Sequence, residues 1–218
     1  MKKLLLSVFL TLAGASVAHA DTSVNLGGTF LNGTSSTVNG SLESSREAGR
    51  FQDIFEVDFL NQKESGVQKE NRIFVTGKAN YALTQRNYAF VMGRYEYDEM
   101  SQFSNRALTG VGWGYKLLRT STTKLSNEVS VGSLTNSDGT SAVIRNSIWL
   151  DQKLTTSTRF VNKFLVESGK DIFILNKTSL VYDLTPTLNL SLNHIFKHDK
   201  YAAVENNNLT TFAVGINF

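Results

Sequence analysis

The sequence predicts a transmembrane, antiparallel, up-and-down β-barrel of about twelve strands, an all-β fold. Three observations predict this class. Apolar residues alternate with small or polar ones through most of the chain, the 218 residues include one proline and no cysteine, and the last strand alternates up to a terminal phenylalanine. Alternation with a period of two is typical of strands that face lipid on one side and a polar interior on the other.

Residues 1–20 have the three parts of a secretory signal peptide. Lys2 and Lys3 precede an apolar stretch from Leu4 to Val17, and Ala18-His19-Ala20 forms an A-x-A cleavage site. We therefore expect cleavage after Ala20 and one barrel domain over residues 21–218. Loss of the two lysines reduces 22 basic residues to 20, against 19 acidic residues. This near-neutral balance gives no reason to expect nucleic acid as a partner.

Twelve strands are predicted, and an even number is expected for a bacterial single-chain barrel. Each is long enough to cross a bilayer when tilted, whereas no segment after residue 20 has the 18 apolar residues of a membrane helix. The predicted ranges are 23–31, 37–46, 50–60, 70–83, 88–98, 103–117, 122–133, 140–152, 157–167, 171–183, 187–198 and 208–218.

The alternation differs in quality from strand to strand. The strands at 37–46 and 171–183 alternate poorly, and Asp53 interrupts an otherwise apolar face at 50–60. The strand at 70–83 places Ile73, Val75, Ala79 and Tyr81 opposite Arg72, Phe74, Thr76 and Lys78. At 88–98, Ala89, Val91, Tyr95 and Tyr97 oppose Phe90, Met92, Arg94 and Glu96, and at 187–198, Leu188, Leu190, Leu192 and Phe196 oppose Asn189, Ser191, Asn193 and Lys197. The repetition across strands is what favours a barrel.

The connectors are predicted to be short at one end and longer and more polar at the other. The short turns are near 47–49, 84–87, 119–121, 153–156 and 184–186. The longer loops are predicted at 61–69, 100–102, 135–139 and 199–207. This asymmetry is expected for short periplasmic turns and longer outer loops.

Charged residues within the strands fall mainly on one parity, which we assign to the barrel interior because charges are costly in hydrocarbon. Ten of them form the predicted lumen charge network and are candidates for lining a pore: Glu56, Asp58, Lys78, Arg94, Glu96, Asp98, Lys116, Glu128, Arg145 and Lys163. Arg72, Asp151, Lys177 and Lys197 have the same parity. The mixed signs suggest ion pairs between neighbouring strands, with Arg94 beside Glu96 and Asp98, rather than a filter of one sign.

The final strand also predicts a biogenesis signal. Phe212, Val214, Ile216 and Phe218 alternate with small or polar residues. This looks like the C-terminal strand that the barrel-assembly machinery recognises in outer-membrane proteins. We expect that machinery and outer-membrane lipid as partners.

The most specific text lies between residues 89 and 132. It comprises Gly93-Arg94-Tyr95-Glu96-Tyr97-Asp98-Glu99, then Arg106, then Gly110-Val111-Gly112-Trp113-Gly114-Tyr115, then Leu125-Ser126-Asn127-Glu128. This run resembles the YdiY-type family of salt-induced outer-membrane proteins, a domain of unknown function. The resemblance implies an osmotic response but no mechanism. Gly110, Gly112 and Gly114 share one face, which would leave room for bulky neighbours such as Arg94 or Glu96.

The sequence shows no recognisable set of catalytic residues. His194 and His198 are the two histidines after residue 20, and no G-x-S-x-G motif occurs. A serine hydrolase needs a base beside a hydroxyl nucleophile, with a third group that orients the base. No cofactor, metal site or catalytic residue is predicted.

The leading hypothesis is a non-enzymatic barrel in the outer membrane of a Gram-negative bacterium, with an envelope or osmotic-stress role, and a narrow solute channel as its sharper form. One alternative is a lipid-modifying barrel enzyme that uses His194. A second alternative is a soluble periplasmic barrel that binds a ligand.

Overall fold

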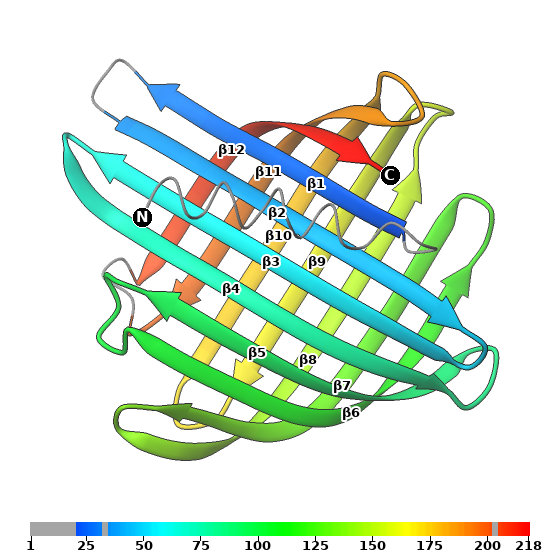
Figure 1. Cartoon of the computed structure of the whole chain (residues 1–218), viewed down its shortest axis with the longest axis horizontal. Helices are drawn as coiled ribbons and strands as arrows, with labels where there is room; N and C mark the ends of the chain where they lie inside the picture. Colours follow the sequence, from blue (N-terminus) through cyan, green and yellow to red (C-terminus); the bar gives the residue numbers. More distant parts are fainter. Residues whose placement is uncertain (1–20, 32–34, 202–204) are drawn as a thin grey trace.

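The computed structural model describes residues 21–31, 35–201 and 205–218, and the predicted signal peptide at 1–20 lies outside these residues. The described chain forms one closed barrel (Figure 1). Its strands are β1 (Asp21–Leu31), β2 (Ser35–Ala48), β3 (Phe51–Glu64), β4 (Val67–Ala82), β5 (Asn87–Asp98), β6 (Asn105–Arg119), β7 (Thr123–Asn136), β8 (Gly139–Lys153), β9 (Thr158–Ser168), β10 (Ile172–Asp183), β11 (Leu188–Asp199) and β12 (Asn206–Asn217).

Every strand pairs antiparallel with its sequence neighbours, and β1 pairs with β12 to close the circle. The predicted fold class and strand count are confirmed. All twelve predicted ranges agree with the observed strands to within four residues at either end. We call the end at which β1 begins and β12 finishes the turn end, and the opposite end the loop end.

The hairpins at the loop end are tighter than predicted. Between β3 and β4 only Ser65 and Gly66 turn, with φ of 50° and 78°. Two positive φ values are what a type I′ hairpin requires. The predicted loop at 61–69 is therefore wrong, because both strands continue into it. The β7–β8 connection is also shorter than predicted and consists of residues 137–138. The predicted difference in connector length between the two ends is therefore limited to the β5–β6 connection at 99–104 and the connection after Asp199.

Four of the five turns at the turn end share a local device. In each turn a threonine donates its backbone N–H to the carbonyl three residues later, and its hydroxyl oxygen accepts a backbone N–H from the same turn. The backbone bonds are Thr84 to Asn87 at 3.0 Å, Thr120 to Thr123 at 2.9 Å, Thr155 to Thr158 at 3.2 Å and Thr185 to Leu188 at 3.0 Å. The hydroxyls of Thr84, Thr120 and Thr185 each accept an N–H at 2.9 Å.

The two faces of the wall differ in polarity. Most outward side chains in mid-strand are apolar, and Val91, Val111 and Val131 are exposed, whereas Phe90 and Met92 point inward and are buried. An apolar exterior around a charged interior suits lipid, not water, which argues against the soluble alternative. Of the described residues, none forms a helix long and apolar enough to cross a membrane.

The interior also holds an apolar cluster against β5, β6 and β8. Tyr88, Phe90, Met92, Leu108 and Val143 pack together there. The rings of Tyr88 and Phe90 lie over Gly114 and Gly112, where a Cβ atom would overlap them. The glycine stripe therefore makes room for aromatic rings, and the expectation that it accommodates Arg94 or Glu96 is wrong.

Candidate functional site

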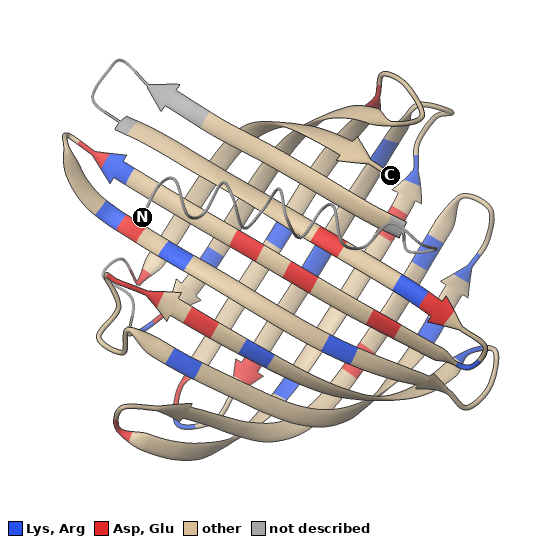
Figure 2. Ribbon diagram, in the orientation of Figure 1, with Lys and Arg blue, Asp and Glu red and all other residues tan. Residues whose placement is uncertain are grey.

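The candidate site is the charged lumen, and the structure places all ten predicted network residues on its inward face. Figure 2 shows that Lys, Arg, Asp and Glu lie along the strands and not only in the connections. Eight of the ten form ion pairs with other interior side chains, and Asp98 accepts a backbone N–H from the β5–β6 connection, as described below. Lys116 instead places its ammonium 5.8 Å from the centre of the inward Tyr88 ring.

Ion pairs in the middle of the lumen join opposite walls. Lys163 of β9 donates to Glu56 of β3 at 2.7 Å, although these strands are six positions apart in the circle of twelve. Lys177 of β10 donates to Asp58 of β3 at 2.8 Å, across five positions. The expectation of pairs between neighbouring strands is therefore wrong for these groups, because side chains from facing walls meet across the lumen.

Arg94 belongs to the same layer. Its two terminal nitrogens donate to the two carboxylate oxygens of Glu167 at 2.7 Å each, in a bidentate pair between β5 and β9. Arg145 of β8 approaches the same carboxylate at 3.5 Å and that of Glu128 at 3.8 Å. Arg94 was predicted to pair with Glu96 and Asp98, and instead its bidentate partner is Glu167.

A second layer lies nearer the loop end. Arg106 of β6 donates at 2.6 Å to Glu96 of β5 and at 2.6 Å to Asp199 of β11 on the opposite wall. Beside it, Lys197 of β11 donates to Glu70 of β4 at 2.6 Å, and Glu70 also contacts Arg72 at 2.9 Å. This layer joins opposite walls of the lumen near the loop end.

Two further predicted residues complete the network. Asp98 is buried and accepts the backbone N–H of Met100 at 3.0 Å, which fixes the start of the β5–β6 connection. Lys78 of β4 donates to Glu128 of β7 at 2.6 Å, and the Tyr88 hydroxyl donates to the same oxygen at 2.7 Å. The contacts of Lys78 and Tyr88 with Glu128 lie toward the turn end, whereas the contact of Asp98 lies at the loop end.

Four of the residues described above were not among the charges predicted for the interior: Glu70, Arg106, Glu167 and Asp199. Arg106 has the parity of Gly110, Gly112 and Gly114, and Glu167 has that of Lys163, so extending the alternation to the strand ends would have found both. Glu70 was the first residue of the strand predicted at 70–83, and Asp199 fell in the loop predicted at 199–207.

The interior side chains of the pair in the middle of the lumen are more exposed than those of the layer near the loop end. The Lys197 and Glu70 side chains are 2% and 5% exposed, whereas those of Lys163 and Glu56 are 35% and 16% exposed. Trp149 of β8 is directly paired with Lys163 and shares its inward face, and it is 37% exposed. The lumen is therefore packed at the loop end and open to water on the side of β3, β8 and β9.

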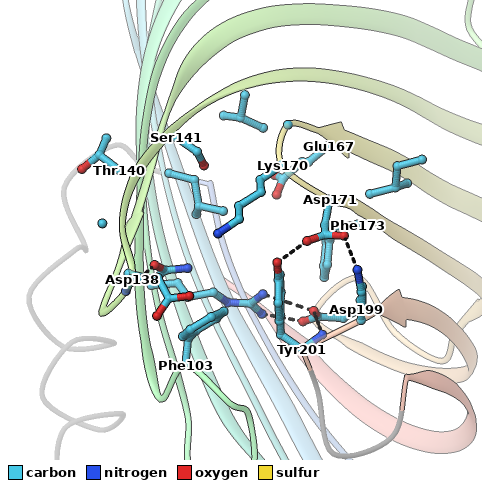
Figure 3. Close-up of a pocket in the computed structure, with 18 residues that line it drawn as sticks. Phe103, Asp138, Thr140, Ser141, Glu167, Lys170, Asp171, Phe173, Asp199 and Tyr201 are labelled. Carbon is cyan, nitrogen blue, oxygen red and sulfur yellow. Dashed lines mark hydrogen bonds and ion pairs between the residues drawn. The ribbon is translucent and has the colours of Figure 1, made fainter.

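A pocket of about 90 Å³ lies at the loop end, above the Arg106 layer. The connections that line it meet across the mouth: Gln102 donates its backbone N–H to the Tyr201 carbonyl at 2.8 Å, and the Phe103 and Tyr201 rings are 4.7 Å apart. Figure 3 shows Tyr201 between Asp171 and Asp199, with Lys170 extending over the pocket. The β5–β6 and β11–β12 connections thus contact each other over the lumen.

Tyr201 is also tied to the β9–β10 turn. Its hydroxyl donates to Asp171, and Lys200 donates to the other oxygen of that carboxylate at 3.0 Å. The hydrogen bond from Tyr201, followed by the Lys200 ammonium, holds the pKa of Asp171 below its usual range, and the same bond raises the pKa of Tyr201. We call Asp171, Lys200 and Tyr201 the mouth latch.

His194 faces outward, not into the lumen. Its Nδ1 lies 3.0 Å from the Thr210 hydroxyl oxygen. Among the described residues no carboxylate contacts His194, so a triad with an orienting acid is not formed there. Within the described part of the chain, no group of three or more His, Cys, Asp or Glu side chains is arranged to hold a metal ion.

The apolar set of the last strand faces outward. Phe212 and Phe218 are 70% and 69% exposed, and Val214 and Ile216 lie between them on the same face. The strand is held on both sides, by β11 and by β1. The predicted assembly signal is therefore part of the lipid-facing wall.

A closed antiparallel twelve-stranded barrel with a charged lumen and an apolar outer wall defines the class of transmembrane β-barrel proteins. Residues 24–218 match the family model described as protein of unknown function, DUF481. The chain belongs to that family, in agreement with the YdiY-type resemblance. A search of curated proteins finds no match.

Solved structures share the fold. The NanC porin has a TM-score of 0.58 at 12% identity, with 90% of this chain and 98% of that chain covered. The KdgM porin, solved in complex with disordered oligogalacturonate, has a TM-score of 0.50 at 11% identity, with 90% and 98% covered. LpxR from Salmonella typhimurium has a TM-score of 0.52 at 7% identity, with 91% and 99% covered. These likenesses concern the fold alone.

Proposed function

We propose that the chain is a non-enzymatic barrel of a Gram-negative outer membrane and that its lumen is a narrow channel for small solutes, restricted by ion pairs between opposite walls. The turn end would face the periplasm, since short turns and both termini lie there in such barrels. The observation that carries the proposal is the Arg106 bridge from Glu96 to Asp199 across the lumen. Two porins among the similar folds support a conduit.

Two other ion pairs of the lumen support the proposed envelope or osmotic-stress role. Ion pairs in a wet lumen are weakened by salt, because mobile ions screen charges over about 8 Å at physiological ionic strength. The exposed pair of Lys163 and Glu56 would respond before the buried pair of Lys197 and Glu70. We propose that rising salt loosens the middle of the lumen before the layer near the loop end and increases the flux of small solutes.

Planar-bilayer recording tests the channel. We expect small unitary steps from the wild type and steps at least threefold larger from Arg106→Ala, which leaves Glu96 and Asp199 without their cation and favours cations over anions. Arg46→Ala is the control, because Arg46 pairs with Asp53 at 3.3 Å at the turn end, where both side chains are exposed. Absence of steps from both the wild type and Arg106→Ala would overturn the channel proposal.

The lipid-modifying alternative has one supporting observation, the 3.0 Å contact of His194 with the Thr210 hydroxyl on the lipid-facing wall. We do not favour it, because a base also needs an orienting group. Release of fatty acid from outer-membrane lipid by the wild type, lost in His194→Ala, would establish it over the non-enzymatic proposal.

Outer-membrane lipid and the barrel-assembly machinery are the proposed partners. The support is the outward row of Phe212, Val214, Ile216 and Phe218, which remains accessible on the wall. Phe218→Ala should lower the fraction of barrel found in the outer membrane of cells, while spontaneous insertion of the purified chain into detergent micelles stays unchanged.

A further inference from the structure

A row of polar side chains crosses the outer wall of the barrel over β9 to β12. The register pairs Asn162 with Thr178, Thr178 with His194, and His194 with Thr210. Residues paired in this way share a face of the sheet. Leu180 and Leu192, two positions along their strands, are 44% and 41% exposed, which places the row on the outward face. We call these four residues the polar ladder.

Hydrogen bonds divide the polar ladder into two pairs. Asn162 Nδ2 donates to the Thr178 hydroxyl at 2.8 Å, and His194 Nδ1 lies 3.0 Å from the Thr210 hydroxyl. Within the described chain no hydrogen bond joins Thr178 to His194. The centre of the polar ladder therefore presents a hydroxyl and an imidazole side by side on the exterior.

The polar ladder interrupts the apolar band. On β10, Ile172 and Ile174 precede the polar residues, and Leu180 and Tyr182 follow them on the same face. Polar groups that face hydrocarbon have no water to bond with, so they favour a protein partner that offers donors and acceptors.

The wall around the polar ladder carries no opposing charge. Along the described strands β9 to β12, all Asp, Glu, Lys and Arg side chains have inward parity. The outer face combines the polar ladder with exposed leucines and Phe212. A second wall of the same kind could approach it without burying an unpaired charge.

We propose that this wall is the contact surface between two copies of the chain in the membrane, related by a two-fold axis along the membrane normal. Copies that insert in the same direction place their polar ladders at the same depth. Each ladder has both donors and acceptors, so it is complementary to itself. The proposal is independent of whether the lumen conducts.

The available surface indicates a reversible dimer. Four strands spaced about 4.8 Å apart and an apolar band about 25 Å tall give about 480 Å² per copy. Stable soluble interfaces bury about 800 Å² per partner. We therefore expect an equilibrium that shifts when the barrel is diluted in lipid.

Cysteine cross-linking tests the contact, because the natural chain has no cysteine. Leu192→Cys lies beside the polar ladder, and Val111→Cys is an equally outward position on β6, five strands away. In phosphatidylcholine–phosphatidylglycerol vesicles under oxidation, Leu192→Cys should give a disulfide-linked dimer and Val111→Cys should not. No dimer from Leu192→Cys, or equal yields from both positions, would overturn the proposal.

Energy transfer between labelled copies tests the polar ladder itself. Dyes on Thr156→Cys, in the exposed β8–β9 turn, should report a dissociation constant that rises about sevenfold when Thr178→Val and His194→Leu remove two polar contacts. Thr109→Val is the control, since Thr109 contacts Ser133 at 3.1 Å on the outer face of β6 and β7. An equal rise in the control, or no energy transfer at any dilution, would contradict the inference, while far-UV circular dichroism checks that each variant is folded.

Discussion

At the scale of single residues, Arg94 contacts side chains on three other strands. It forms the bidentate pair with Glu167 on β9, and its guanidinium lies 5.4 Å and 5.5 Å from the ring centres of Phe74 on β4 and Phe173 on β10. A planar guanidinium suits such combined pairing and stacking, which a lysine could not reproduce. One side chain thus holds strands from two sides of the lumen.

Removing Arg94 should be costly. Arg94→Met leaves the buried Glu167 with Arg145 at 3.5 Å as its remaining ion pair, and we expect a loss of about 3 kcal/mol in the free energy of unfolding. The double variant Arg94→Met with Glu167→Met should lose less than the sum of the single changes. Urea unfolding in lipid vesicles measures both, with Arg46→Met as the exposed control. A loss in Arg94→Met no larger than in that control would contradict the pairing.

The mouth latch should respond to acid. The pKa of Asp171 is lower in the folded than in the unfolded protein. The stabilisation from its carboxylate is therefore fully present above the unfolded pKa of about 4 and is lost as pH falls through the folded pKa. Because the pKa of Tyr201 is raised, its hydroxyl keeps the proton that it donates to Asp171 up to a pH above about 10. A nitroxide on Ser104→Cys in the β5–β6 connection should become more mobile below about pH 4, and Asp171→Asn should be mobile already at neutral pH. Equal mobility of both proteins across this range would refute the latch.

At the scale of elements, the turn end depends on the repeated threonine turns. Each hydroxyl replaces a missing backbone partner, so removing one leaves N–H groups without their acceptor. The turns keep adjacent strands in register at one rim, whereas the loop end relies on glycine at Gly66 and Gly139, where φ is 78° and 119°. The two rims therefore differ in local chemistry, except at the β2–β3 turn of the turn end, where Gly49 has a φ of 63°.

Replacing a turn threonine should destabilise the barrel modestly. Thr120→Val removes the acceptor for two backbone N–H groups at 3.3 Å and 2.9 Å, and we expect a loss of about 1 kcal/mol. Ser121→Ala in the same turn changes an exposed hydroxyl and should have little effect. Urea midpoints of the two variants provide the comparison, and indistinguishable midpoints would argue against the device.

The elements also show how far sequence reasoning reaches. Alternation located all twelve strands and placed charges such as Glu56 and Lys163 on the inner face, because side-chain period depends only on local backbone geometry. The predicted loop length was wrong at 61–69, because polar residues there continue the two strands. The predicted ion-pair partner of Arg94 was also wrong. Its pairing with Glu167 depends on the cross-section of the closed barrel, which no local sequence pattern encodes.

At the scale of the whole molecule, three layers of contacts define the barrel. Lipid-facing apolar residues cover the outside, hydrogen-bonded strands close the wall, and ion pairs cross the lumen. Among the described residues, the β1–β12 closure has six paired positions, from Ser23 with Asn217 to Gly28 with Phe212, whereas the β8–β9 pair has ten. The cross-lumen pairs hold facing walls together and so supplement this short seam.

Site-directed spin labelling tests most directly the claim that successive side chains face lipid and lumen in turn. Nitroxides on Leu190→Cys and Val214→Cys, both outward, should be accessible to dissolved oxygen and shielded from a water-soluble nickel complex in lipid vesicles. A label on Ser191→Cys, the inward neighbour of Leu190, should show low oxygen access. Strong collision of the labels at 190 and 214 with the nickel complex would contradict the transmembrane barrel.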